Sequence, residues 1–181
     1  MTVPDTSGDR LLEGVRVLDL SRVMSGPFCT AMLADLGAEV IKIEMPGGGD
    51  DSRHFGPFKD GESAYFMLLN RGKKSMTLDL KSERGREILL AMVKSCDVVI
   101  ENFKVGGLAK YGLDYASLKD ANPRLVYCSI TGFGQTGPYA PRAGYDFLMQ
   151  GMSGLMSVTG EIGGEPQKYG VAVTDVFTGL Y

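Results

Sequence analysis

Short apolar runs alternate along this chain with segments that carry helix-starting and helix-ending residues. Apolar runs of this length and β-branched content predict buried strands, and the intervening segments predict helices. The predicted strands cover residues 15–20, 39–43, 74–80, 97–101 and 124–130. The predicted helices cover residues 27–36, 83–95, 108–111 and 115–121. Strands that alternate with helices favour an α/β fold: a Rossmann-like, open, mostly parallel sheet with flanking helices.

Residues at the predicted helix ends support these boundaries. Pro27 occupies the first turn of one helix, where its missing N–H costs nothing, and Gly37 follows the end of that helix. Ser82 precedes another helix as a candidate N-cap. Residues 45–61 form a polar stretch rich in Gly and Pro, which predicts a loop. Residues 63–69 are apolar, and their pattern does not decide between helix and strand.

The residues that directly follow the predicted strands are the first candidates for a binding site. In open parallel sheets, ligands lie outside the carboxyl ends of the strands. These residues are 21–26, 45–50, 81, 102–104 and 131–137.

Asp175 is a candidate nucleophile near the end of the sequence. It stands between an apolar run, residues 171–173, and a second apolar segment, residues 176–181. Asp at the start of a helix is an N-cap arrangement, and the helix dipole favours its ionised form there. An ionised carboxylate in a partly closed site can attack an acyl group. A plain helix cap is the alternative, and the local sequence leaves both open.

Size and charge limit the class of protein. The 181 residues, 44% hydrophobic and 23% charged, suit one globular domain, or one domain and part of another. The net charge is −3 and the basic residues are scattered, so nothing points to a nucleic-acid partner. No apolar stretch approaches the ~20 residues of a membrane span. Residues 1–11 lack a signal-peptide pattern and predict a short flexible arm.

Cysteine and histidine usage argues against a metal site. The three cysteines, Cys29, Cys96 and Cys128, are odd in number, lie in apolar surroundings and have no metal-like spacing. We interpret them as reduced thiols of a cytoplasmic protein. His54 is the single histidine, and nothing near it supports a zinc site or a Ser-His-Asp triad.

One glycine motif resembles a dinucleotide-binding fingerprint. Residues 132–137 read Gly-Phe-Gly-Gln-Thr-Gly and follow a predicted strand. The fingerprint normally opens a helix, whereas Pro138 and Pro141 follow this motif. It also follows the fifth predicted strand, not the first. We therefore predict a Gly-rich turn here and no nicotinamide nucleotide.

Eight segments of the chain carry, in one order, the motifs of a known family. They are residues 17–27, 33–44, 70–75, 97–103, 122–127, 131–138, 143–146 and 174–179. This set closely resembles the class III (CaiB/BaiF-type) CoA-transferases over residues 12–181. That family includes formyl-CoA:oxalate, carnitine and succinyl-CoA-dependent dicarboxylate CoA-transferases, and also the α-methylacyl-CoA racemases. Each motif is weak alone, whereas eight in register are specific.

The resemblance implies a fold, a set of partners and an incomplete chain. Residues 12–181 would form most of a Rossmann-like CoA-binding and catalytic domain, whose remainder would follow later in the chain. The expected partners are an acyl-CoA and a free carboxylic acid, with an interlocked homodimer for the full-length chain. The CoA thioester is a substrate, and the resemblance implies no permanently bound cofactor and no metal.

The resemblance also assigns catalytic residues. Asp175 matches the family's nucleophilic aspartate, and Tyr145 and Asp146 match active-site positions beside it. Asp175 would attack the acyl-CoA to form an aspartyl–acyl anhydride, and the released CoA would then form an aspartyl–CoA thioester. The acceptor acid, expected to be a dicarboxylate, would finally take over the CoA.

Further positions match CoA contacts in the family. These are Val23, Met24, Ser25, Gly26, Leu78, Lys81, Asn102 and Lys110. Met24 is a departure, because oxalate-specific members carry Gln there, and this argues against oxalate or formate as substrate. Met45 stands where an Arg often contacts a CoA phosphate. For Lys81 and Lys110, a solvated lysine at a helix edge is an equally good interpretation.

Two other functions stay open at this point. A racemase needs a base and an acid at the α-carbon, and its motif carries His where this chain has Tyr145. A phenol with a pKa near 10 is a poor base at neutral pH, so the transferase is favoured. A non-catalytic CoA- or nucleotide-binding module is the other alternative, and the presence of Asp175 speaks mildly against it.

Overall fold

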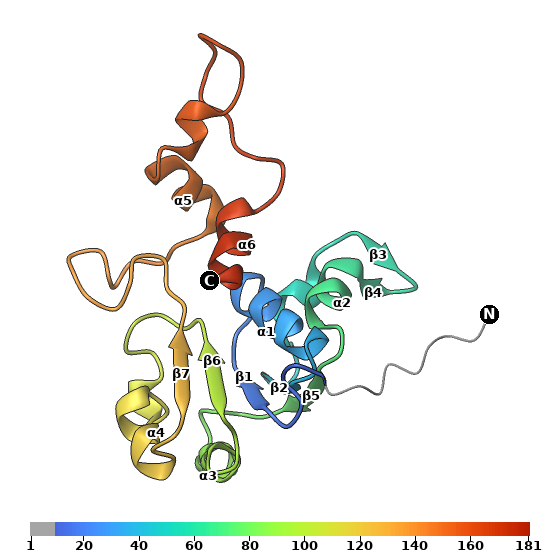
Figure 1. Cartoon of the computed structure of the whole chain (residues 1–181), viewed down its shortest axis with the longest axis vertical. Helices are drawn as coiled ribbons and strands as arrows, with labels where there is room; N and C mark the ends of the chain where they lie inside the picture. Colours follow the sequence, from blue (N-terminus) through green and yellow to red (C-terminus); the bar gives the residue numbers. More distant parts are fainter. Residues whose placement is uncertain (1–9) are drawn as a thin grey trace.

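A five-stranded parallel sheet forms the centre of the molecule (Figure 1). The computed structural model describes residues 10–181, so the predicted flexible arm, residues 1–11, lies outside the described residues except for its last two. The strand order is β5-β2-β1-β6-β7. The strands are β1 (Arg16–Asp19), β2 (Glu39–Glu44), β5 (Lys74–Thr77), β6 (Val98–Glu101) and β7 (Val126–Ser129). The prediction of an open parallel α/β sheet is confirmed.

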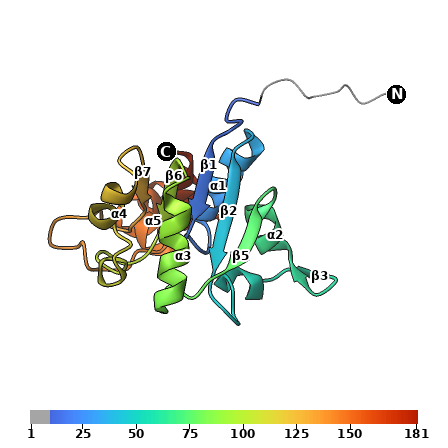
Figure 2. The same ribbon diagram turned by 90° about the horizontal axis from the view of Figure 1, so that it is seen from below.

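Helices cover both faces of this sheet (Figure 2). They include α1 (Ser25–Asp35), α3 (Glu83–Val93) and α4 (Tyr115–Ala121). Because side chains alternate along a strand, Val17 of β1 packs toward α1, whereas its neighbour Leu18 packs in the core beneath α3. Each face thus has its own apolar core. Among residues 10–181, no helix combines the length and the apolarity that crossing a bilayer requires.

The segment between β2 and β5 holds more structure than its composition predicts. It contains the 3-10 helix η1 (Asp51–His54), a small antiparallel hairpin of β3 (Phe58–Lys59) and β4 (Glu62–Ser63), and α2 (Ala64–Asn70). The apolar stretch of undecided type is therefore a helix, and the Ser63 hydroxyl caps it by accepting a hydrogen bond from the Phe66 amide at 3.1 Å.

Strand β5 ends three residues before its predicted end at residue 80. Leu78 donates one more backbone hydrogen bond, to Glu44 at 2.9 Å, and the chain then turns. The Asp79 carboxylate accepts a hydrogen bond from the Lys81 amide at 2.9 Å, and this local turn competes with further strand pairing.

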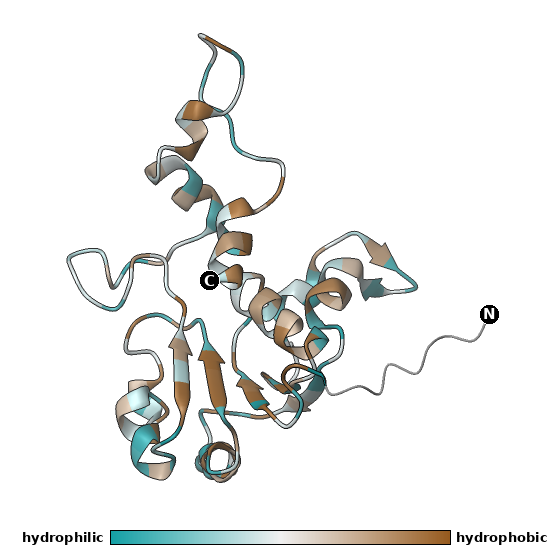
Figure 3. Ribbon diagram, viewed as in Figure 1, coloured by the Kyte–Doolittle hydropathy of each residue, from teal (hydrophilic) through white to brown (hydrophobic). Residues whose placement is uncertain are grey.

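The last part of the described chain extends away from the sheet and then returns to it (Figure 1). After η2 (Ala109–Tyr111) and β7, it forms α5 (Asp146–Met152), η3 (Leu155–Val158) and α6 (Val173–Leu180). Hydrophobic positions lie along α5 and α6 (Figure 3), and several of their large apolar side chains are exposed. They are Phe147, Leu148, Met152, Phe177 and Leu180.

Candidate active site

The candidate site lies where the strand order reverses, at the carboxyl ends of β1 and β6. β1 continues into α1 on one side, and β6 leads into the segment before α4 on the other. Connections that diverge in this way leave a crevice above the sheet, the common ligand position in open α/β folds. The loop after β1, residues 20–24, and the residues after β6 lie on the two sides of this point of the sheet.

Asn102 joins these two segments. Its Oδ1 accepts a hydrogen bond from the Arg22 amide at 3.0 Å, and its Nδ2 donates to the Arg22 carbonyl at 2.7 Å. Both ends of the side-chain amide are thus used to hold the loop after β1. The predicted CoA contact of Asn102 stays a prediction, and the observed role of this residue is to position Arg22.

The start of α1 carries two backbone donors without a side-chain cap. Met24 occupies the N-cap position without making a side-chain hydrogen bond to the helix, so the N–H groups of Ser25 and Gly26 are uncapped. Pro27 has no N–H, and the Phe28 N–H donates to the Met24 carbonyl at 2.7 Å. Ser25 and Gly26 are buried, and Val23 and Met24 are half-buried. A Cβ on Gly26 would lie 2.3 Å from Ser21 Cβ, so only glycine lets the loop fold this tightly onto the helix.

Asp175 lies in the first turn of α6 and not at its N-cap, which corrects the prediction from sequence. The helix begins two residues earlier, at Val173, and Ala172 is its N-cap. The capping oxygen comes from Asp146, whose Oδ1 accepts hydrogen bonds from the Thr174 amide at 2.8 Å and from the Thr174 hydroxyl at 2.6 Å. The cap is therefore supplied by a neighbouring helix.

Burial, reinforced by the negative charge of Asp146, raises the pKa of Asp175 to about 6. The side chain is half-buried. At neutral pH most molecules thus carry an ionised Asp175 that is poorly solvated. A carboxylate of this kind is a better nucleophile toward an acyl group than one in open water.

Helix α6 crosses the start of α1 at Gly179. A Cβ on Gly179 would lie 2.6 Å from the Ser25 carbonyl oxygen and 3.0 Å from Phe28 Cδ1, so the two helices touch there backbone to backbone. Asp175 is four residues from Gly179, which is roughly 6 Å along a helix. Asp175 therefore lies one turn of α6 before the residue that contacts the start of α1.

Tyr65 of α2 is influenced by the charges of the candidate site and was missed from the sequence. Burial, followed by the charges of Asp175, Asp50 and Asp146, raises the pKa of its phenol to about 12. A half-buried tyrosine that three carboxylates influence can donate a hydrogen bond into the site. Because the sequence pattern of residues 63–69 did not decide between helix and strand, it gave no reason to place Tyr65 in the site.

Tyr145 and Asp146 take different positions at the start of α5. Tyr145 is 70% exposed, and within residues 10–181 its hydroxyl makes no hydrogen bond. The second carboxylate oxygen of Asp146 accepts a hydrogen bond from Gln150 Nε2 at 2.6 Å, so this carboxylate is held on both sides. Their catalytic roles stay predictions.

The remaining predicted CoA contacts follow the carboxyl ends of their strands. Leu78 is buried in the core on the α3 side. Lys81 is exposed, and Lys110 is exposed with its ammonium group 4.8 Å from the centre of the Tyr111 ring. The CoA contacts of both lysines stay predictions.

The glycine motif at residues 132–137 is a turn and opens no helix, as predicted. Its first glycine is required by a close crossing of two backbone segments. A Cβ on Gly132 would lie 2.4 Å from the Cα of Gly144, which itself leads into α5. Within residues 10–181, no group of three or more His, Cys, Asp or Glu side chains is placed to hold a metal ion, and the three cysteines are free thiols.

Comparison with known proteins gives a consistent result. Residues 12–181 match the model of CoA-transferase family III. The chain is 59% identical over 177 residues to the succinate–glutarate CoA-transferase of Agrobacterium fabrum, covering 94% of this chain and 44% of that protein. It is 49% identical to the human succinyl-CoA:glutarate CoA-transferase, covering 98% of this chain and 41% of that protein.

Solved structures show the same relationship. A CaiB/BaiF family protein from Brucella suis is 57% identical, with a TM-score of 0.92, covering 96% of this chain and 47% of that chain. A hypothetical protein from Mycobacterium tuberculosis is 36% identical, with a TM-score of 0.87, covering 95% and 48%. The chain thus spans less than half the length of these relatives. By its match along residues 12–181 and by its fold, the chain belongs to CoA-transferase family III.

Proposed function

We propose that a protein of the relatives' length that contains this chain, here called the whole protein, transfers CoA from an acyl-CoA to a free dicarboxylic acid. The observation that carries the proposal is Asp175, a half-buried carboxylate with a pKa of about 6, on a helix packed across the start of α1. Similar proteins are named for transfer between succinate and glutarate, and others for succinyl-CoA and mesaconate. These names support a dicarboxylate as acceptor.

The proposed reaction begins with attack by Asp175 on the thioester carbonyl. The C–S bond breaks, giving an aspartyl–acyl anhydride and CoA thiolate. The thiolate then attacks the aspartyl carbonyl, which releases the donor acid and leaves an aspartyl–CoA thioester. A carboxylate suits this step because its anhydride retains the acyl-transfer potential of the thioester.

The second half of the reaction repeats these steps with the acceptor. The acceptor carboxylate attacks the aspartyl–CoA thioester and forms a new anhydride with loss of CoA thiolate. The thiolate attacks the acceptor's carbonyl, and free Asp175 returns. In each addition the free N–H groups at the start of α1 would stabilise the developing oxyanion, since such donors need no reorganisation.

Substrate binding is assigned to the crevice above β1 and β6. Val23, Met24, Ser25 and Gly26 would lie against the thioester, and Lys81 and Lys110 would meet the CoA phosphates. Tyr65 would donate a hydrogen bond to a carboxylate or to the anhydride. The exposed apolar side chains of α5 and α6 would be covered by the later part of the chain and by a second subunit of an interlocked homodimer, and we place the enzyme in the cytoplasm.

The test replaces Asp175 in the whole protein and follows CoA exchange by mass over a panel of acyl-CoAs and free acids, with succinyl-CoA and glutarate first. We expect Asp175→Asn and Asp175→Ala to lower turnover by at least about a thousandfold, with CoA binding retained. Asp120→Asn, on the exposed side of α4, is the matched control and should transfer normally. Turnover of Asp175→Ala within tenfold of the parent would exclude Asp175 as the nucleophile.

A further inference from the structure

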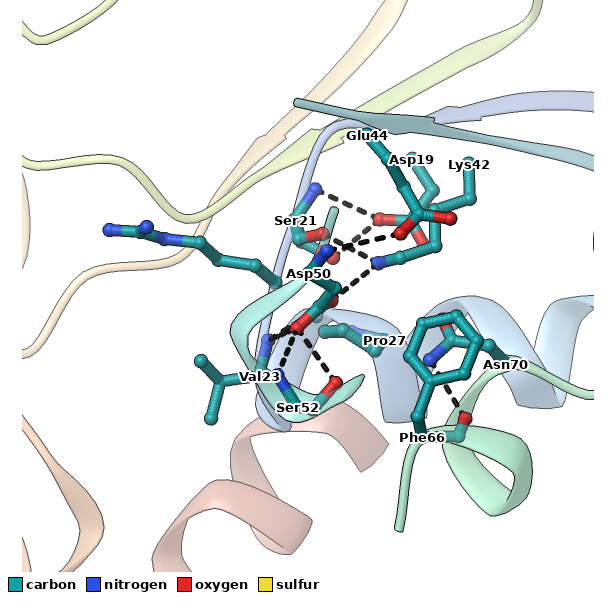
Figure 4. Close-up of polar contacts among 12 residues, drawn as sticks. Asp19, Ser21, Val23, Pro27, Lys42, Glu44, Asp50, Ser52, Phe66 and Asn70 are labelled. Atoms are coloured by element: carbon teal, nitrogen blue, oxygen red, sulfur yellow. Dashed lines mark hydrogen bonds and ion pairs between the residues drawn. The ribbon is translucent and has the colours of Figure 1, made fainter. Parts of the chain in front are cut away.

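A buried ion pair lies directly beneath the loop after β1 (Figure 4). Lys42 Nζ of β2 lies 2.8 Å from Asp50 Oδ2, and their side chains are only 2% and 1% exposed. Lys42 also donates a hydrogen bond to the Ser21 carbonyl at 2.9 Å. Burying two charges has a high desolvation cost, and such pairs add little net stability. We therefore look for the role of the Lys42–Asp50 pair in the groups that it holds in place.

Val23 has a backbone conformation that valine avoids. Its φ is 70°, in the left-handed region, where a β-branched side chain collides with its own backbone. The Val23 amide donates to both oxygens of the Asp50 carboxylate, at 3.1 and 3.3 Å. Strained residues persist only where their surroundings determine their conformation, and this occurs most often at functional sites.

Three successive amides of the loop are held by three different side chains: one at the end of β1, one after β6 and one after β2. The Ser21 amide donates to Asp19 Oδ1 at 2.9 Å, the Arg22 amide to Asn102 Oδ1 at 3.0 Å, and the Val23 amide to Asp50. Among these three held positions, only Val23 has a strained φ. Asp50 is thus the group whose hydrogen bonds offset that strain.

The Asp50 carboxylate is held in place by Ser52 and Lys42. Its Oδ1 accepts hydrogen bonds from the Ser52 amide at 2.9 Å and from the Ser52 hydroxyl at 2.7 Å, while its Oδ2 meets Lys42. The Asp50 amide donates to Glu44 Oε2 at 3.0 Å. Every group around the carboxylate is a donor, so only a carboxylate, with acceptors on both oxygens, satisfies the position.

We propose that Asp50 is a positioning residue that holds Val23 in the left-handed conformation and so aims the start of α1 at the reacting thioester. This inference rests on the proposed CoA-transferase function. The chain needs the sharp turn at Val23 to pass from the end of β1 into Met24 and Ser25. Relaxation of Val23 to a negative φ would move the first-turn N–H groups, and a misplacement of about 1 Å can cost on the order of a hundredfold in rate.

The first test compares Asp50→Asn with Asp51→Asn in the whole protein. An asparagine at 50 must turn its NH₂ group either toward Lys42, which leaves the buried ammonium without its counter-charge, or toward the Val23 and Ser52 amides, which loses both of these hydrogen bonds. We expect kcat to fall about a hundredfold while the KM for acyl-CoA changes less than about threefold. Asp51 is exposed and pairs with Arg22 at 3.1 Å, and its variant should stay within threefold of the parent.

The Val23→Gly variant distinguishes a positioning role of Asp50 from a general effect of Asp50→Asn on the structure. Glycine adopts φ near 70° without strain, so it does not need Asp50. In the Val23→Gly background, Asp50→Asn should lower kcat less than about fivefold, in contrast to the hundredfold loss with valine. Equal losses in both backgrounds would overturn the proposal.

A second variant, Val23→Pro, tests the same inference if the Asp50→Asn protein does not fold. Proline fixes φ near −65° and removes the N–H, and it leaves the buried pair untouched. We expect the same large loss of kcat from this variant. Turnover within threefold of the parent would overturn the proposal.

Hydrogen exchange gives a readout that does not depend on catalysis. Asp50→Asn should speed exchange of the amides at residues 21–25 in the free whole protein and leave β2 protected. If the parent transfers no CoA but this change is seen, the proposed function fails and the positioning role stands. If the parent is active and Asp50→Asn leaves both exchange and kcat unchanged, the positioning role alone fails.

Discussion

Asp146 caps the helix that carries Asp175: its Oδ1 accepts hydrogen bonds from the amide and the hydroxyl of Thr174, at 2.8 and 2.6 Å. The same oxygen lies 3.4 Å from the Asp175 amide nitrogen. Gln150, which is fully buried, holds the other Asp146 oxygen at 2.6 Å. One carboxylate therefore fixes the first turn of α6 and, through its charge, opposes ionisation of the candidate nucleophile.

The first prediction concerns the pH dependence of transfer. The reaction needs ionised Asp175, so kcat/KM of the whole protein should fall as the pH drops through about 6. Asp146→Asn removes a like charge, and the acid limb should move to lower pH. It should stay above the range of an ordinary aspartate, because burial is the larger cause of the raised pKa. A limb that stays in place or moves to higher pH would contradict this electrostatic role.

The second prediction concerns stability. The pKa of Asp175 is about 6 in the folded protein, above the ordinary aspartate value of 3.8, so the folded state binds its proton more tightly. Ionisation between about pH 4 and pH 6 therefore costs stability, and the loss persists above pH 6. Asp175→Asn has no charge to bury and should be more stable than the parent by about 1–3 kcal/mol at pH 7.

The pH of the measurement provides the control for this stability gain. At pH 4 the parent's Asp175 is largely protonated in the folded state, so the advantage of the asparagine should vanish. Denaturant unfolding of both proteins at the two pH values measures the difference. A variant that is less stable than the parent at pH 7 would show that Asp175 stabilises the fold.

The third prediction concerns the crossing of α1 and α6. Gly179→Ala would place a Cβ 2.6 Å from the Ser25 carbonyl oxygen, so the helices must separate. We expect a loss of about 1–3 kcal/mol in the free energy of unfolding, together with a lower kcat. Gly151→Ala is the matched control on α5, where the nearest atom would be Met156 Sδ at 3.7 Å. Alanine there should be neutral or gain up to about 1 kcal/mol, and equal stability of the two variants would contradict the close crossing.

Sequence patterns predict the sheet well because each strand is an apolar run buried between two layers. β2 was predicted as residues 39–43 and is Glu39–Glu44, and β6 was predicted as residues 97–101 and is Val98–Glu101. α5 and η3 were not predicted. Their large apolar side chains are mostly exposed, so they form no stripe that would face a core.

The site was predicted in its residue types and less well in its geometry. Asp175 was expected as an N-cap, but the capping oxygen belongs to Asp146, 28 residues from Thr174, and local sequence cannot show this. Asp50 was predicted in a polar loop and among the residues that follow the second strand, but without a role of its own. Lys42 offered a usable signal, because a lysine inside an apolar parallel strand must find a buried carboxylate.

The fate of the acceptor's oxygen tests the covalent role of Asp175 most directly. In the proposed reaction the bridging oxygen of the second anhydride comes from the acceptor and stays on Asp175. The whole protein would be incubated with succinyl-CoA and glutarate labelled with ¹⁸O in its carboxylates, in unlabelled water. Cleavage after Arg142 and Lys168 places Asp146 and Asp175 in different peptides, so one digest contains its own control.

We predict that the peptide with Asp175 gains heavy oxygen, that the peptide with Asp146 stays unlabelled, and that the released succinate becomes labelled in later turnovers. Label in succinate without label on Asp175 would mean that the acceptor attacks the acyl-CoA directly, and it would contradict the role of Asp175 as the nucleophile.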